Sequence, residues 1–368
     1  VLIHGMGNLG KSSLAARVAA RLPDHRTAVV FGEYHALAVF NAVARVIDEI
    51  ADGMPLAEAK PLKEEIATLS ADVTGNEDNL EDALRRLLRG VLNTNPVLLI
   101  LDDLEQALET PSADQPEVLP KAAYAPALQA VLNAFQAATA SRLLLTSRYD
   151  FTLTDGSGKD LTFGLERVPL APMRARERQK QWRARARAED KESTAAEAPK
   201  NLIDDALSAA AGNPGLQAEL TRPLLAGETE AARAAIEAIQ AFRATGEGPP
   251  EDVDLGDFFG RMAFETYAEA LTGTQKAALS AATLFAEEVP VPRSALEAAA
   301  GAHAIDEPAP ALDRLLALGL LDDWGEMRGW SSMPALAHAA VNPLARSLVE
   351  PLTEADEKAL AGAVPDVL

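Results

Sequence analysis

Short apolar runs alternate with segments of helical periodicity over the first half of the chain. Few polar residues interrupt these runs, which is typical of strands buried on both faces of a parallel sheet. We predict strands at Val1–His4, Thr27–Phe31, Val97–Leu101, Arg142–Thr146 and Arg167–Leu170. We predict helices at Lys11–Arg21, Ala36–Ala51, Leu62–Leu69, Asn79–Leu92 and Ala125–Ala137. This alternation indicates an α/β fold in which helices cover both faces of a parallel sheet.

After Ala171 the pattern is helical, with a polar loop expected over Glu189–Lys200 and a hinge over Gly246–Pro250. The expected helices are Arg174–Arg187, Leu202–Ala211 and Glu228–Ala244. The first of these carries seven basic residues on two opposite sides, with a thin strip around Trp182 between them. We interpret it as a solvated helix that packs through Trp182 rather than as a nucleic-acid-binding stripe.

The last third predicts helices followed by a hairpin, which is the order of a winged helix. The expected helices are Phe258–Leu271, Thr274–Phe285, Arg293–Ala300 and Ala309–Leu318. Leu320–Trp324 and Met327–Ser332 form the expected hairpin, with its turn at Gly325-Glu326. A closing helix is expected over Ala335–Val349, with a kink at Pro343. Thr353–Leu360 reads as the start of another helix.

These segments predict three domains and the start of a further one. We assign residues 1–171 to a nucleotide-binding domain, 172–250 to an all-helical lid and 251–352 to a winged-helix domain. Residues 353–368 begin a further segment. Because Val1 already lies within a strand-like run, we expect the sequence to be an internal piece of a longer chain.

Composition narrows the function classes. The formal net charge of −21 opposes binding to nucleic-acid phosphates, so nucleic acid is an unfavoured partner. No apolar run approaches the roughly 20 residues that span a bilayer, so we expect no membrane association. The absence of cysteine excludes thiol catalysis, disulfides and thiolate zinc sites, and it fits the cytoplasmic location that we expect.

The stretch Gly5–Ser12 reads GMGNLGKS and matches the phosphate-binding pattern G-x-x-x-x-G-K-[ST] in full. It follows a predicted strand and opens a predicted helix, which is the context that the pattern requires. Its amides and the helix N-terminus would cradle phosphates, Lys11 would reach the β- and γ-phosphates, and Ser12 would bind Mg²⁺. The expected nucleotide-binding residues here are Gly5, Gly7, Asn8, Leu9, Gly10, Lys11, Ser12 and Ser13.

Two further strands end in polar residues suited to phosphate chemistry. Asp102 and Asp103 follow a buried strand, as in a Walker B motif; Asp102 suits Mg²⁺, and Asp103 suits activation of the attacking water. Glu105 is a weaker candidate for the same role. Arg148 follows another buried strand, from which it would reach the γ-phosphate. Lys11 and Asp103 are therefore the candidate catalytic residues.

In this order the motifs resemble the STAND class of P-loop ATPases, most closely the NB-ARC type. The phosphate loop with its Ser-Leu-Ala continuation, Leu101–Leu104 and Thr146–Arg148 resemble that family's motifs over about Val1 to Val349. Gly212–Leu216 resembles its G-x-P motif, which implies that Pro214 packs on adenine. One departure is that Met333-Pro334-Ala335-Leu336 stands where the family has Met-His-Asp, although His338 lies about one helical turn later.

The resemblance implies an ATP/ADP switch with Mg²⁺, slow hydrolysis, self-association when ATP is bound, and sensor or effector domains outside this sequence. A transcription regulator of similar architecture would also fit, but its expected recognition helix, Ala309–Leu318, has only Arg314 as a base. A small-molecule kinase could use the basic helix as its lid. An AAA+ motor would need an arginine from a neighbouring subunit.

Overall fold

The computed structural model describes residues 1–115, 117–245, 270–286, 289–328, 335–342 and 344–364. The chain divides into two compact units that are interleaved along the sequence. The first unit consists of Val1–His4, Lys11–Thr110 and Glu117–Val168. The second consists of Gly5–Gly10, Pro111–Pro116 and Pro169–Leu368, so the phosphate-loop residues before Lys11 group with the C-terminal half of the chain.

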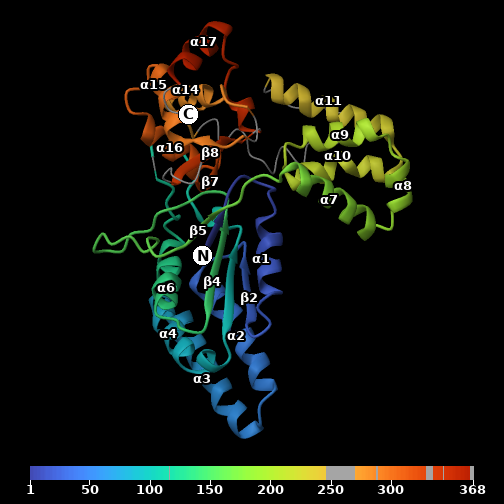
Figure 1. The fold of residues 1–368 in the computed structure, drawn as a ribbon. Coiled ribbons are helices and arrows are strands. Elements are labelled where there is room, and N and C mark those ends of the chain that lie inside the picture. The colour runs from blue at the N-terminus through green and yellow to red at the C-terminus, as the bar shows by residue number, and fades with distance from the viewer. Residues whose placement is uncertain (116, 246–269, 287–288, 329–334, 343, 365–368) are drawn as a thin grey trace. The chain divides into compact units, whose positions relative to one another are not determined.

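A five-stranded sheet with the order β2-β3-β4-β1-β5 forms the centre of the first unit (Figure 1). Its strands are β1 (Leu2–His4), β2 (Arg26–Phe31), β3 (Val97–Asp102), β4 (Arg142–Ser147) and β5 (Arg167–Pro169). The pairings of β1 with β4, β4 with β3, and β3 with β2 are parallel, which confirms the predicted sheet. β3 is buried from Val97 to Leu101 because helices cover both of its faces.

Helices of the first unit cover this sheet on both faces. They are α1 (Lys11–Ala19), α2 (Ala36–Asp52), α3 (Leu56–Gly75), α4 (Leu80–Arg89), α5 (Val91–Thr94) and α6 (Ala125–Gln136), with 3-10 turns η1 (Glu77–Asn79) and η2 (Leu104–Ala107). The helix predicted from Leu62 begins six residues earlier, at Leu56, and accommodates Pro61. The helix predicted over Asn79–Leu92 is divided at Gly90.

A run of helices follows β5 within the second unit, namely α7 (Ala175–Ala188), α8 (Glu192–Glu197), α9 (Lys200–Ala209), α10 (Pro214–Ala226) and α11 (Thr229–Thr245). Trp182 of α7 is buried, as the strip of the basic helix predicted. The Arg174 guanidinium stacks on the Trp324 ring, 4.4 Å from its centroid. The prediction of a loop over Glu189–Lys200 was wrong, because α8 lies within it.

The described C-terminal part of the second unit combines helices with a small antiparallel sheet of order β6-β8-β7. Its elements are α14 (Gly273–Ala282), β6 (Val291–Pro292), α15 (Arg293–Ala302), α16 (Pro308–Ala317), β7 (Leu321–Arg328), β8 (Ala335–Val341), η3 (Ala345–Leu348) and α17 (Glu354–Ala363). The helix predicted over Thr353–Leu360 corresponds to α17. The hinge at 246–250 and nearly all of the helix predicted at 258–271 lie outside the described residues.

Two predictions for this sheet were wrong. Gly325 is not in a turn: β7 runs through it, and its positive φ of 68° serves a bulge at which the Gly325 amide donates to Asp323 at 2.7 Å. The closing helix expected over Ala335–Val349 is strand β8 followed by the short turn η3. His338 therefore lies on a strand paired with β6 and β7. Across the described residues, no helix is long and apolar enough to cross a membrane.

Candidate functional site

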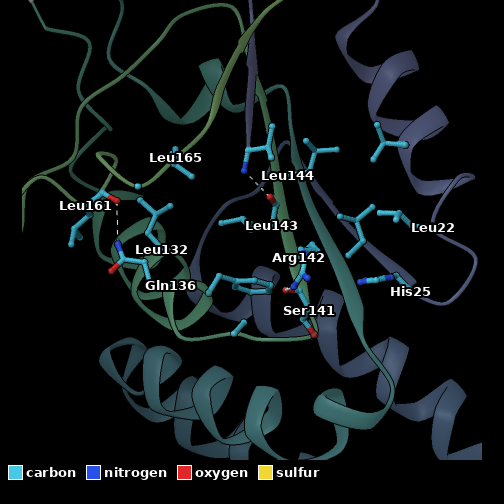
Figure 2. A pocket seen from close by; sticks show the side chains of 16 residues that line it. Leu22, His25, Leu132, Gln136, Ser141, Arg142, Leu143, Leu144, Leu161 and Leu165 are labelled. Atoms are coloured by element: carbon cyan, nitrogen blue, oxygen red, sulfur yellow. Dashed lines mark hydrogen bonds between the residues drawn. The ribbon is translucent and has the colours of Figure 1, made fainter.

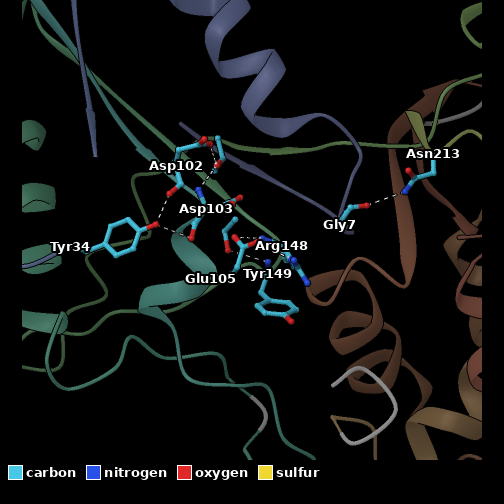
Figure 3. A network of polar contacts seen from close by, with 10 residues as sticks. Gly7, Tyr34, Asp102, Asp103, Glu105, Arg148, Tyr149 and Asn213 are labelled. Atoms are coloured by element: carbon cyan, nitrogen blue, oxygen red, sulfur yellow. Dashed lines mark hydrogen bonds and ion pairs between the residues drawn. The ribbon is translucent and has the colours of Figure 1, made fainter. Parts of the chain in front are cut away.

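The carboxyl ends of β3 and β4 bring polar residues together in the first unit (Figure 3). The Thr146 hydroxyl donates to Asp102 Oδ1 at 2.5 Å and accepts from the Asp103 amide at 2.9 Å. Thr146 is fully buried, and it follows Leu145, which pairs with Leu101, the residue before Asp102. One hydroxyl thus fixes both the metal candidate and the backbone of the base candidate.

Tyr34 supports the same two aspartates from the other side of the cluster. Its hydroxyl lies 2.5 Å from the Asp102 carbonyl oxygen and 2.9 Å from that of Asp103, so the single phenolic proton is shared between them. Burial raises the pKa of Tyr34, and the nearby carboxylates add to this effect, so the hydroxyl remains a donor. Asp103 adopts the left-handed conformation, with φ 54°, and these contacts hold it there.

Arg148 is held by Glu105 in this structure. The Arg148 Nε donates to Glu105 Oε1 at 2.9 Å, and the Arg148 backbone amide donates to Glu105 Oε2 at 3.2 Å. Their side chains are only 22% and 12% exposed, so water screens this pair less than a surface pair. Glu105, the weaker candidate for a base, therefore binds the candidate sensor arginine.

Lys11 opens α1 and is 6% exposed. Burial lowers the pKa of Lys11; Glu105, Asp103 and Asp102 oppose this shift, and Arg148 adds to it. Burial also raises the pKa of Asp103, with Glu105 and then Asp102 adding to the effect. Four of the predicted residues are thus close enough to influence one another, namely Lys11, Asp102, Asp103 and Arg148. The raised pKa of Asp103 makes its carboxylate a better proton acceptor.

The loop Gly5–Gly10 belongs to the second unit and has the backbone that a phosphate cradle needs. Gly5, Asn8 and Gly10 have positive φ angles of 143°, 60° and 88°. A Cβ on Gly5 would lie 2.8 Å from the Leu170 carbonyl oxygen, which explains why glycine occupies this position. The first turn of α10 contacts the loop, because the Gly215 amide donates to the Asn8 carbonyl oxygen at 3.2 Å.

The remaining predicted binding residues lie in the loop and in the first turns of two helices. Leu9 is buried in the loop, whereas Ser12 and Ser13 are exposed in the first turn of α1. Pro214 is the first residue of α10, and its carbonyl oxygen accepts from Gln181 Nε2 at 3.1 Å. Within the second unit, the structure therefore brings the proline of the G-x-P motif beside the loop.

A cavity of about 520 Å³ lies elsewhere in the first unit (Figure 2). It is lined by residues at the amino ends of the strands, including His25 before β2 and Arg142 at the start of β4. His25 Nε2 lies 3.1 Å from the Ala140 carbonyl oxygen, and Gln136 donates to the Leu161 carbonyl oxygen at 3.3 Å. This cavity is at the opposite strand ends from Asp102 and is separate from the candidate site.

The contacts of three residues in the site could not be predicted from the sequence. Tyr34, Glu105 as a partner of Arg148, and Asn213 as a partner of the loop all act through contacts with residues more than 40 positions away. The contact of Thr146 with Asp102 could have been predicted from the sequence. Thr146 ends a buried strand expected next to the Walker B strand, and a hydroxyl there can bind the aspartate.

The first part of the chain is similar to a known protein family. Residues 1–145 match the AAA ATPase domain family. The chain therefore contains an ATPase domain of the AAA-like P-loop type, and the sheet of its first unit has five strands. No curated protein matches the chain.

Three solved structures match the chain with TM-scores below 0.5. The Walker-type ATPase of Pyrococcus abyssi has a TM-score of 0.49 and 13% identity, over 95% of this chain and 90% of that protein. The Aeropyrum pernix ORC1 protein, solved in complex with DNA, has a TM-score of 0.31 and 14% identity, over 100% and 88%. A Thermotoga maritima RuvB variant has a TM-score of 0.29 and 14% identity, over 92% and 83%.

Proposed function

We propose that this protein is a STAND-class signalling switch, in which exchange of ADP for ATP and slow hydrolysis control its conformation and self-association. The observation that carries this proposal is the pairing of Arg148 with Glu105 next to Lys11, Asp102 and Asp103. A sensor arginine already bound to a protein carboxylate needs a competing anion to release it. The γ-phosphate, which ATP has and ADP lacks, is such an anion.

Nucleotide binding in this proposal rests on the loop and the start of α1, which are consecutive in the chain. The loop amides and Lys11 would bind the β- and γ-phosphates, and Pro214 would pack on adenine. Ser12 and Asp102 supply only oxygen ligands, which is the donor set that Mg²⁺ prefers. Asp102 fits this role because Thr146 occupies its Oδ1 and leaves Oδ2 for the ion or its water. When bound, Mg²⁺ would neutralise charge on the phosphates.

Asp103 is the proposed general base. It would accept a proton from a water molecule whose oxygen attacks the γ-phosphorus. The bond between that phosphorus and the β–γ bridging oxygen then breaks, which leaves ADP and inorganic phosphate. The raised pKa of Asp103 favours proton acceptance, while Tyr34 and Thr146 fix its backbone.

The order of elements in the second unit supports the rest of the architecture. α7 to α11 provide the proposed helical lid, and the order α14-β6-α15-α16-β7-β8 fits a winged helix. Arg314, the only basic residue of α16, is 5% exposed and donates to the Ser112 carbonyl oxygen at 3.3 Å. Because α16 presents no exposed base to DNA phosphates, we infer that this module mediates contacts within the protein.

The switch is tested by titrating nucleotide-stripped protein with ATP and ADP in Mg²⁺ by calorimetry, and by measuring its mass in each state by light scattering. We expect Lys11→Ala to abolish binding and Asp103→Asn to retain binding but slow phosphate release at least tenfold. Lys60→Ala, which changes an exposed lysine of α3, is the matched control and should behave as wild type. Equal masses in ATP and ADP would contradict the switch, and no binding would contradict the nucleotide site itself.

A further inference from the structure

The outer side of the phosphate loop is bonded to the start of α10. Asn213 Nδ2 donates to the Gly7 carbonyl oxygen at 3.0 Å, and the Gly215 amide donates to the next carbonyl oxygen, that of Asn8, at 3.2 Å. Figure 3 shows the bond between Asn213 and Gly7. Asn213 is 1% exposed, so water competes little for this bond. Two consecutive loop carbonyls are therefore held by one helix end 206 residues away in sequence.

Glycines allow the backbone to come this close. A Cβ on Gly215 would lie 2.6 Å from the Asn8 Cβ. A Cβ on Gly319, which follows α16, would lie 3.0 Å from the Met6 amide nitrogen. Gly212 approaches Met173 equally closely, because a Cβ on Gly212 would lie 2.5 Å from the Met173 carbonyl oxygen. The loop is thus packed against two separate backbone segments of the second unit.

Asn213 has two roles, and its amide group suits both. Its Oδ1 accepts from the Leu216 amide at 3.0 Å and caps α10, while its Nδ2 binds the loop. Serine and aspartate are equally good caps, but neither carries an amide donor. The cap and the bond to the loop can therefore be separated by substitution.

We propose that Asn213, with Gly215, is a positioning clamp that sets the phosphate loop in its binding shape and couples nucleotide affinity to the packing of α10. In a trans peptide the N–H points opposite to the C=O. Holding the Gly7 and Asn8 carbonyls away from the phosphate site therefore points the amides of the next residues toward it, where they can bind phosphate. It also stabilises Asn8 at its φ of 60°, a conformation that few residues adopt. Coupling of this kind is reciprocal, so bound nucleotide stabilises the contact between the loop and α10. The inference rests on the proposed nucleotide site.

The test compares Asn213→Ser and Asn213→Asp with wild type, using nucleotide titration and hydrogen exchange of the loop amides. A buried hydrogen bond is worth roughly 1–1.5 kcal/mol, so we expect about tenfold weaker ADP and ATP binding in the serine variant. The aspartate variant should bind still more weakly, because it places a negative charge near the phosphates. Loop amides should exchange faster in both variants, even without nucleotide.

Asn342→Ser is the matched control. Asn342 is 2% exposed, accepts from the Leu344 amide at 3.1 Å and donates to Asp322 at 3.2 Å, so its loss removes the same kinds of bond. This control should lower stability without changing nucleotide affinity or loop exchange. An equal loss of affinity in the control, or unchanged affinity in the Asn213 variants, would overturn the clamp.

The outcomes also distinguish the clamp from the proposed function. If the wild-type protein binds no nucleotide, the proposed function fails, whatever the loop exchange shows. If the wild type binds and the Asn213 variants bind equally well, only the clamp fails. Circular dichroism checks the fold of each variant, and the near-isosteric aspartate variant carries the test if the serine variant does not fold.

Discussion

Tyr34 shows how one side chain can fix two residues of the candidate site. Its hydroxyl is shared between the Asp102 and Asp103 carbonyl oxygens, at a point where Asp103 has the uncommon φ of 54°. Without this donor, the backbone on which the candidate base stands could relax toward a commoner conformation. Tyr34 therefore holds the candidate base through its backbone.

Tyr34→Phe should slow ATP hydrolysis by about tenfold while leaving the Kd for ATP within about twofold, because it loosens Asp103 and not the phosphate loop. Single-turnover phosphate release together with calorimetry separates the two effects. Tyr124→Phe is the control, since Tyr124 packs edge-on against Tyr34 at 5.8 Å and loses the same atom. A loss of affinity equal to the loss of rate would contradict this assignment.

Asp322 gives a pH-dependent prediction in the second unit. It is 7% exposed, and burial raises its pKa to about 8, although the hydrogen bond from Asn342 opposes this. Because the folded protein keeps this proton at pH values where the unfolded chain has released it, Asp322 makes the folded state less stable as pH rises from about 4 to about 8.

Asp322→Asn mimics the protonated carboxyl at every pH. Chemical unfolding should therefore give similar stabilities for wild type and variant near pH 4, and a more stable variant above pH 8. The measured quantity is the difference between the two proteins at each pH, which cancels the titration of shared groups. A difference that does not change with pH would show that Asp322 is not protonated in the native state.

At the residue scale, sequence identifies the parts of the site that are contiguous. Gly5–Ser12 and Asp102-Asp103 can be recognised because backbone cradle, lysine and acids occupy fixed positions along the chain. The Glu105 pairing with Arg148 and the Asn213 contact with Gly7 depend on strand order and on packing between distant segments. No local pattern contains that information.

At the scale of elements, β2 is an edge strand whose two faces differ. Val30 is 4% exposed on the face that α2 covers, whereas Val29 and Phe31 are 54% and 61% exposed on the other face. An edge strand with exposed apolar residues favours association with other chains. Here these residues alternate with core residues along the strand.

The alternation predicts opposite results for adjacent valines. Val29→Thr should change the free energy of unfolding by less than about 0.5 kcal/mol, because its side chain already contacts water. Val30→Thr should cost about 1–2 kcal/mol, because it buries a hydroxyl without a partner. Urea unfolding measures both. Equal costs would mean that the strand register differs from the pairing of Val30 with Leu101.

Strands were predicted best where apolar runs are long and buried on both faces, as in β3 and β4. The errors have physical causes. The alanine-rich stretch Ala335–Val341 has helical propensity, but its pairing with both β6 and β7 overrides that preference. The helix predicted from Leu62 begins earlier, at Leu56, because Pro61 lies in the early turns of α3, where few backbone bonds are lost.

For the whole molecule, the net charge of −21 opposes any assembly of identical copies. The Debye length falls from about 30 Å at 0.01 M salt to about 8 Å at 0.15 M, so salt screens this repulsion over most surface distances. We expect ATP-dependent self-association to strengthen as salt rises through this range, as measured by sedimentation or light scattering. Weaker association at higher salt would indicate an interface of complementary charges instead.

The interleaved chain has a consequence for how this protein can be dissected. A shortened version ending at Val168 would contain the whole P-loop motif, yet it would lack Asn213 and Gly215, which donate to the Gly7 and Asn8 carbonyl oxygens. Such a truncation would contain the complete P-loop motif, but its phosphate loop would no longer be held in one backbone conformation. Residues 1–168 are therefore an unsuitable minimal version for ligand screening, because excision of the helices would impair the very phosphate binding that the motif predicts.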